Sequence, residues 1–232
     1  MTHSAARAAR FDLPASTPPF YTWEVHEKPI SVRIPYDLMD RLEQDVIENF
    51  RSLTSRGSEI GGLLVGSVTP GNPVIVALTD YEIIPCDYSI GPLYRLSAAD
   101  VGRFERALQQ CLLAGQRVAG FFRSHARRGL SLDAADLSFF EQRFPEPHHI
   151  ALLVRPYAAK ASKAGIFIRE GNTLNGASSL LEFPFRSSEL VVQASRLANT
   201  EPKMTQARMP VLLTTRATRH PPACGAVRAT SP

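Results

Sequence analysis

The chain has 232 residues, of which 44% are hydrophobic and 21% are charged, so it can form one soluble domain with a substantial core. No apolar run approaches the ~18 residues that cross a bilayer, and the first 20 residues lack the apolar segment of a secretory signal. The three cysteines lie far apart without a CxxC pair, which argues against a disulfide or zinc-finger framework and favours a reducing compartment. The sequence therefore predicts a cytoplasmic protein that does not associate with a membrane.

The net charge of +4 is concentrated at the C-terminal end of the chain. From Ser187 onward six basic residues stand against two acidic ones, namely Arg196, Lys203, Arg208, Arg216, Arg219 and Arg228 against Glu189 and Glu201. No aromatic residues alternate with these arginines to make a stacking surface, so the excess charge is weak evidence for nucleic-acid binding. We interpret it as a solvated tail.

Residues 1–24, rich in proline, serine and alanine, are expected to form a flexible tail. Apolar runs and alternation after it predict strands, and these cover Ile30–Ile34, Glu59–Gly66, Val74–Ile84, Arg117–Phe122, Ile150–Val154 and Gly165–Ile168. The turn residues of 69–73 (TPGNP) join the second and third of these strands as a hairpin.

Three helices are predicted from apolar residues at helical spacing. They run from Asp37 to near Arg56 and Gly57, from Ser97 to Gly115 and from about Ala134 to Phe144. Ser97 and Asp100 suit an N-terminal cap with an acidic residue in the first turn. The strands and helices alternate in a way that indicates a mixed α/β sandwich rather than a doubly wound nucleotide-binding domain.

Periodicity fades after about Ser187, and we predict a disordered basic tail over residues 187–232. One domain is therefore expected over residues 25–186. No glycine-rich phosphate loop opens any of the predicted helices, since GGLLVG (residues 61–66) lies within a strand.

Candidate chemistry falls in three segments of this domain. Glu59 stands at the head of a strand, Arg123 and His125 stand at the end of another, and Asp133 and Asp136 stand at the start of the third helix. Residues i and i+2 of a strand face the same side, so Arg123 and His125 are expected to point together. The loop that follows can bring an aspartate back over the strand end. A histidine and an aspartate that converge in this way are half of a zinc site.

These residues resemble the MPN/JAB domain family, whose metal-dependent members are the JAMM peptidases. The matching segments are Glu59–Gly66 (EIGGLLVG), Gly120–His125 (GFFRSH) and Asp136. The family pattern has a glutamate before a Gly-Leu-Leu-x-Gly strand, then His-Ser-His after a Gly-aromatic pair, then a serine and an aspartate further on. The resemblance implies an MPN/JAB-like, cytidine deaminase-like three-layer sandwich with a mixed sheet flanked by helices. It covers about residues 30–170.

By this resemblance Glu59 matches the general base, and His125 and Asp136 match two of the three zinc ligands. Asp133 stands where the family has the serine that helps to hold the oxyanion, although Ser131 could take that place after a short shift. The departure from the pattern is Arg123, which replaces the first ligand histidine. Arginine offers only donors and stays protonated, so it cannot bind a cation.

Two functions remain open. In the first, Arg123 pairs with Glu59 and Asp136 in place of the metal, and the domain is a non-hydrolytic binding or scaffold module for a protein, a peptide or a small anion, without a cofactor. In the second, it is a variant zinc-dependent peptidase or isopeptidase, with Glu59 as base and with His125 and Asp136 as ligands.

Arg127 and Arg128 stand in the loop beside this site. If the pocket binds an anion, these two residues are expected to be its receptors together with Arg123. If it does not, a pair of arginines in a loop is an ordinary solvated surface feature.

Overall fold

The computed structural model describes residues 19–52, 58–89, 91–126, 129–171 and 173–200. One mixed sheet of nine strands runs through them in the order β1-β2-β4-β3-β5-β6-β7-β8, with β9 paired to β7. The strands are β1 Phe20–Glu24, β2 Ile30–Pro35, β3 Gly61–Thr69, β4 Val74–Ile83, β5 Arg117–Ser124, β6 Ile150–Arg155, β7 Lys163–Glu170, β8 Thr173–Leu174 and β9 Glu182–Pro184. The pairs β2–β4 and β5–β6 are parallel and the other pairs are antiparallel.

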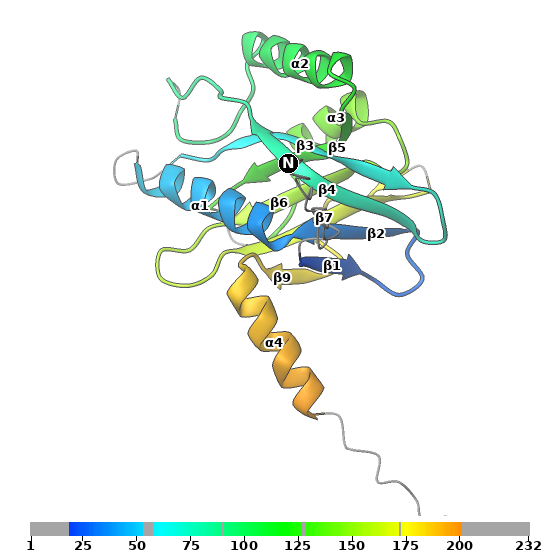
Figure 1. The fold of residues 1–232 in the computed structure, drawn as a ribbon. Helices are drawn as coiled ribbons and strands as arrows, with labels where there is room; N and C mark the ends of the chain where they lie inside the picture. Colours follow the sequence, from blue (N-terminus) through cyan, green and yellow to red (C-terminus); the bar gives the residue numbers. More distant parts are fainter. Residues whose placement is uncertain (1–18, 53–57, 90, 127–128, 172, 201–232) are drawn as a thin grey trace, which may run out of the picture.

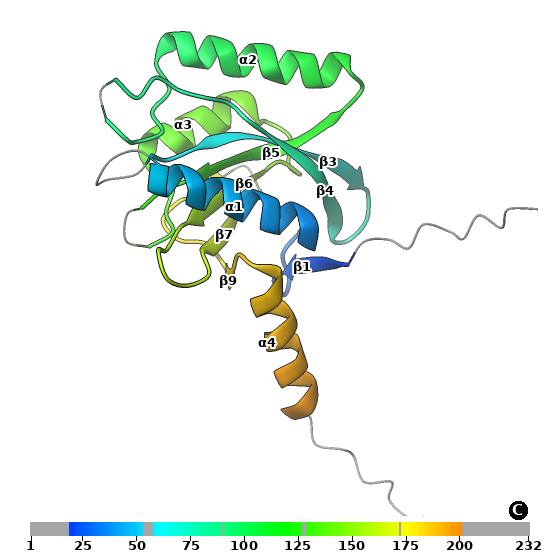
Figure 2. The ribbon, with the colours of Figure 1, turned by 60° about the vertical axis from the view of Figure 1, so that its left-hand side comes forward.

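Helices lie on both faces of this curled sheet (Figures 1 and 2). Helix α1 (Tyr36–Ser52) covers one face, and α2 (Ala98–Leu113) and α3 (Ala134–Arg143) cover the other. The predicted cap of α2 is confirmed, because Ser97 and Asp100 form a reciprocal capping box at its first turn. The α/β class and the helix-flanked mixed sheet predicted from the sequence are therefore present.

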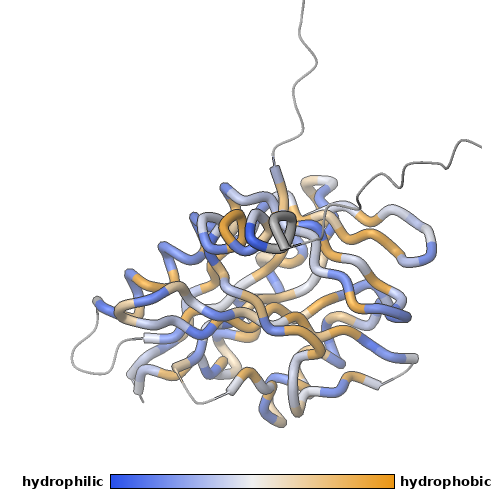
Figure 3. The backbone as a smooth tube through the Cα atoms, turned by 90° about the horizontal axis from the view of Figure 1, so that it is seen from below, coloured by the Kyte–Doolittle hydropathy of each residue, from blue (hydrophilic) through white to orange (hydrophobic). Residues whose placement is uncertain are grey.

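Two hydrophobic cores result from the alternation of side chains along the strands. On the α1 face, Leu64 and Phe122 belong to a cluster that includes Leu38 and Leu42 of the helix. On the other face, their neighbours Leu63 and Phe121 join Phe104 of α2 and Phe140 and Phe144 from the region of α3. In Figure 3 the hydrophobic stretches lie mostly in the interior of the domain and the hydrophilic stretches mostly towards its outside.

The N-terminal tail predicted over residues 1–24 is too long, because residues 20–24 form β1, which pairs antiparallel with β2. Trp23 of this strand is fully buried and its Nε1 donates a hydrogen bond to the carbonyl of Leu181 at 3.2 Å. Because Trp23 is the one buried side chain of this five-residue strand, the strand has too little apolar signal to be recognised beside the prolines. Residues 1–18 of the predicted tail lie outside the described part of the chain.

The C-terminal tail predicted from residue 187 begins instead with α4 (Ser187–Thr200). The start of this helix is held to α1, since Asp40 accepts hydrogen bonds from the Ser187 amide at 2.9 Å and from its hydroxyl. Arg186 adds an ion pair to Glu43 at 2.8 Å, and Leu190 is buried. Tertiary contacts at its first turn thus fix a helix whose own sequence pattern is weak. Residues 201–232 lie outside the described part.

Among the described residues, no helix is both long and apolar enough to cross a membrane.

Candidate functional site

Glu59 lies immediately before β3 and is 5% exposed. The pairing of β3 with β5 places Gly61 opposite Arg123, and the amide of Ile60 donates to the Ser124 hydroxyl at 2.9 Å just beyond that pair. The Glu59 carboxylate accepts two hydrogen bonds at Oε2, one from the Tyr94 amide at 3.0 Å and one from Arg123 Nη2 at 2.9 Å. The strand register therefore brings Glu59 to the end of β5, 64 positions away in sequence.

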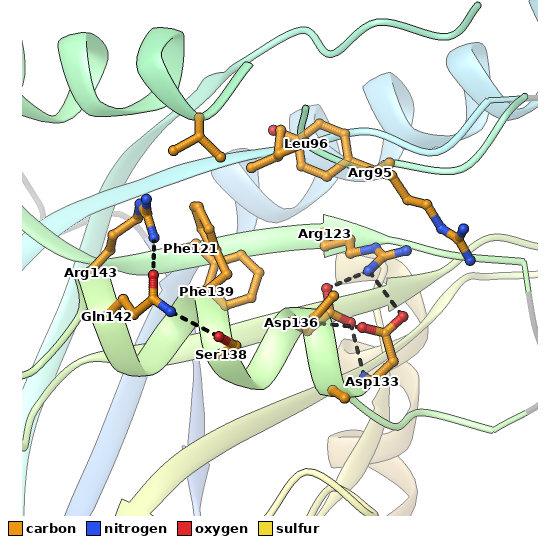
Figure 4. Close-up of a pocket in the computed structure, with 14 residues that line it drawn as sticks. Arg95, Leu96, Phe121, Arg123, Asp133, Asp136, Ser138, Phe139, Gln142 and Arg143 are labelled. Atoms are coloured by element: carbon orange, nitrogen blue, oxygen red, sulfur yellow. Dashed lines mark hydrogen bonds and ion pairs between the residues drawn. The ribbon is translucent and has the colours of Figure 1, made fainter. Parts of the chain in front are cut away.

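Arg123 is the central charge of the site and is 3% exposed. Its Nη2 binds Glu59, and its Nη1 binds the carboxylate of Asp136. Asp133 lies further off, with Oδ2 at 3.8 Å from Nη1. The guanidinium thus lies between Glu59 and Asp136, two acidic residues that come from distant parts of the chain. Figure 4 shows the side of the guanidinium that faces Asp136 and Asp133.

Asp133 and Asp136 also build the start of α3. Asp133 is the N-cap, and its Oδ1 accepts from the Asp136 amide at 2.9 Å. The Asp136 carboxylate accepts in return from the Asp133 amide at 3.1 Å. This reciprocal capping box holds the Asp136 side chain in the orientation in which it meets Arg123. One acidic pair therefore serves both helix capping and the charge network.

Burial and charge act in opposite directions on these groups. Burial alone would lower the pKa of the Arg123 guanidinium, but the carboxylates of Asp136 and Glu59 outweigh it and raise that pKa above its usual value. Burial raises the pKa of the Asp136 carboxyl, and the neighbouring Arg123 charge offsets this only in part. Among these opposing effects, the Arg123 charge is the one that favours the ionised form of Asp136 most strongly.

The other predicted site residues are not all brought together. His125 is 3% exposed and directly follows β5, and its amide donates to the carbonyl of Val154 at 3.0 Å, but it does not line the cleft described below. Of the two candidates for the position of the family serine, Asp133 lies beside Arg123, whereas Ser131 is exposed. Arg127 and Arg128, the expected anion receptors, lie outside the described residues.

A cleft of about 620 Å³ opens beside Arg123 and Asp136. It runs along α3 and β5 and is closed from above by the segment that precedes α2 (Figure 4). Three residues of that segment line the cleft, namely Tyr94, Arg95 and Leu96. None of them was predicted from the sequence as a site residue. They follow a stretch without periodicity, and no motif marks them.

The Tyr94 ring packs closely against Gly61, the first residue of β3. A Cβ atom on Gly61 would lie 2.5 Å from the Tyr94 ring, which is closer than real contacts allow. The Tyr94 hydroxyl donates to the carbonyl of Ile84 at 2.9 Å, so the ring cannot easily move aside. The absence of a side chain at Gly61 thus lets Tyr94 place its amide on Glu59.

The residues of this site do not fit a zinc ion. A structural or catalytic zinc needs three or four ligands with free lone pairs. Here Glu59 and Asp136 are bound by a guanidinium, which stands where a further ligand would have to be. No group of three or more histidine, cysteine, aspartate or glutamate side chains in the described part of the chain is arranged to hold a metal. The arrangement provides a fixed guanidinium, paired with two carboxylates, beside a mainly apolar cleft.

Comparison with known proteins gives no family. No family model matches the chain, and no curated protein matches it either. Among solved structures, a solution structure of a protein from Desulfitobacterium hafniense has a TM-score of 0.41 and 16% identity, covering 61% of this chain and 86% of that one. A protein from Salinibacter ruber has a TM-score of 0.39 and 17% identity, covering 62% and 87%. At these TM-scores neither likeness identifies a fold family.

Proposed function

We propose that this chain is an MPN/JAB-like domain in which Arg123 takes the place of the catalytic metal, and that it binds a ligand in the cleft without hydrolysing it. The observation that carries the proposal is the position of one guanidinium between Glu59 and Asp136, with its two terminal nitrogens on the two carboxylates. In the family pattern, the residues at these positions are a base and a metal ligand. The charge that a zinc ion would supply is here supplied by a side chain.

Ligand chemistry favours this function over a variant zinc peptidase. A metal ion would have to displace Arg123 from Asp136 and would leave a buried guanidinium without its counter-charges. The permanent positive charge would also repel the ion at close range. No hydrolytic step is therefore assigned to Glu59.

The partner classes expected from the sequence, a protein, a peptide or a small anion, and the cytoplasmic location are parts of the same proposal. The cleft supports a binding role because it is of the size that ligand sites have, about 300–1,000 Å³. Arg123 and Asp136 also line the cleft, so the charge network lies next to the space that a ligand would occupy.

Zinc content of the purified protein tests the proposal. After incubation with zinc and removal of the excess, the wild-type chain is expected to retain well under one equivalent. Near-stoichiometric zinc that is lost on His125→Ala would overturn the proposal and favour the peptidase.

The variant Arg123→His restores the family pattern and is expected to gain zinc. Arg169→His, at another buried arginine, serves as the matched control and is expected to gain none. A gain of zinc by both variants would show unspecific binding and remove this support.

A further inference from the structure

The cleft beside Arg123 has a preformed apolar wall. Phe121 of β5 and Phe139 of α3 meet edge to face, with ring centroids 5.7 Å apart at 77°. Phe139 also meets Phe104 of α2 edge to face, at 4.8 Å and 87°. Leu96 and Val101 line the cleft as well (Figure 4). Because each ring is fixed by another, the wall is rigid before any ligand arrives, which reduces the entropy lost on binding.

The acidic groups of the cleft are already engaged. Asp136 accepts from Arg123 and from the backbone of Asp133, and Asp133 accepts from the backbone of Asp136. At the other end Gln142 donates to the Ser138 hydroxyl at 2.9 Å and accepts from Arg143 at 3.0 Å. The acceptors that line the cleft therefore have donors.

Among the side chains that line the cleft, the buried polar atoms without a hydrogen-bond partner are donors. Nε of Arg123 and Nε of Arg143 are buried and have no acceptor among the described residues. Arg95 is exposed, and its guanidinium makes no hydrogen bond or ion pair with the described part of the chain. Figure 4 shows Arg95 at the same end of the cleft as Arg123, whose own terminal nitrogens are taken. A ligand would have to bring acceptor atoms to this end.

We propose that the cleft binds a small amphiphilic monocarboxylic acid, with the carboxylate on Arg95 and the apolar body against Phe121 and Phe139. Arginine presents paired donors that match a carboxylate. The apolar body would run along α3 towards Arg143, and the two positions 136 and 143 are about 10 Å apart along a helix at 1.5 Å per residue. This inference rests on the proposed binding function and specifies the chemical class of the ligand.

Octanoate, 1-octanol and octylammonium test this inference, because they share one apolar chain and differ in the head group. Calorimetric titration of the full chain is expected to show binding of octanoate and at least roughly tenfold weaker binding of octanol, from the charge-assisted hydrogen bond that octanol lacks. Stronger binding of octylammonium, or equal binding of all three, would overturn the proposal, as would no binding of octanoate.

Three variants locate the site. Arg95→Gln is expected to lower octanoate affinity roughly tenfold and to leave octanol unchanged. Ala135→Trp, at an exposed residue that lines the cleft, is expected to abolish both. Arg117→Gln is the matched control, since Arg117 is exposed at the opposite end of β5, and should change neither. Octanoate affinity that survives Arg95→Gln and Ala135→Trp would place the acid elsewhere and refute the inference.

These results are independent of the metal test. A zinc-free protein that fails to bind octanoate loses the ligand class but keeps Arg123 as the substitute for the metal. A chain that binds stoichiometric zinc fails the proposed function whatever its affinity for the acid.

Discussion

Removal of the Arg123 guanidinium would leave two buried carboxylates without their counter-charge. The side chains of Glu59 and Asp136 are 7% and 9% exposed, so water cannot replace the lost partner. Breaking a buried ion pair in this way costs about 3–5 kcal/mol. For a domain of this size, about 2–4 °C of melting temperature is lost per kcal/mol. We expect Arg123→Met to unfold at a temperature roughly 6–20 °C lower than the wild type.

The loss should depend on pH. Burial raises the pKa of Asp136 and Arg123 lowers it, so the variant has an Asp136 pKa that is higher still. A carboxyl whose folded pKa exceeds its unfolded value takes up a proton on folding, and stability then falls as pH rises through the interval between the two values. Denaturant unfolding should therefore show a smaller difference between variant and wild type near pH 5 than near pH 8.

Two further variants separate this effect from lost packing. Arg169 is also buried, and among the described residues its Nη2 donates to the carbonyl of Phe144 at 3.1 Å and to no carboxylate, so Arg169→Met should cost about 1–2 kcal/mol without the pH dependence expected for Asp136. Combining Arg123→Met with Glu59→Gln and Asp136→Asn removes the charges together and should recover part of the lost stability. A loss below about 1 kcal/mol that does not vary with pH would refute the reasoning.

Three other outcomes are expected. Gly62→Ala would put Cβ 1.8 Å from the carbonyl oxygen of Glu82 on the paired strand, and should cost about 3 kcal/mol or prevent folding, as measured by urea denaturation. Asp133→Ala removes the N-cap of α3 and should lower the free energy of unfolding by about 1 kcal/mol. The matched variant Ser97→Ala, at the N-cap of α2, should have the same effect. A much larger loss of stability for Asp133→Ala would indicate that Asp133 has a stronger role in the charge network. Burial lowers the pKa of His149 to about 4, so its neutral form favours folding. Stability should decline as pH falls from about 6.5 towards that value, and His149→Gln should flatten this part of the profile if the assignment is correct.

The charge network could be anticipated from the sequence because local patterns fixed each of its members. Glu59 stands before an apolar strand, Arg123 ends another, and Asp136 opens a helix. The strand register and the helix cap then leave little freedom in where these side chains meet. The ion pairs of Arg123 with Glu59 and Asp136 are those that the residue types suggested.

The cleft could not be anticipated in the same way. Tyr94, Arg95 and Leu96 belong to an irregular segment, and their position depends on the Tyr94 amide binding Glu59 and on the ring resting against Gly61. Such contacts join parts of the chain that no short pattern relates. Arg95 shows the same limit, because nothing in its sequence context indicates that its guanidinium is exposed and makes no hydrogen bond or ion pair with the described part of the chain.

The first and last strands complete one core. The rings of Tyr21 in β1 and Phe183 in β9 lie 4.6 Å apart, and Trp23 donates its hydrogen bond to Leu181 in the segment before β9. The contacts between β1 and β9 therefore cannot form during synthesis until β9 has left the ribosome. Contacts between residues so distant in sequence also form slowly. Newly made chains would therefore expose the aromatic side chains of Tyr21 and Trp23 during that interval.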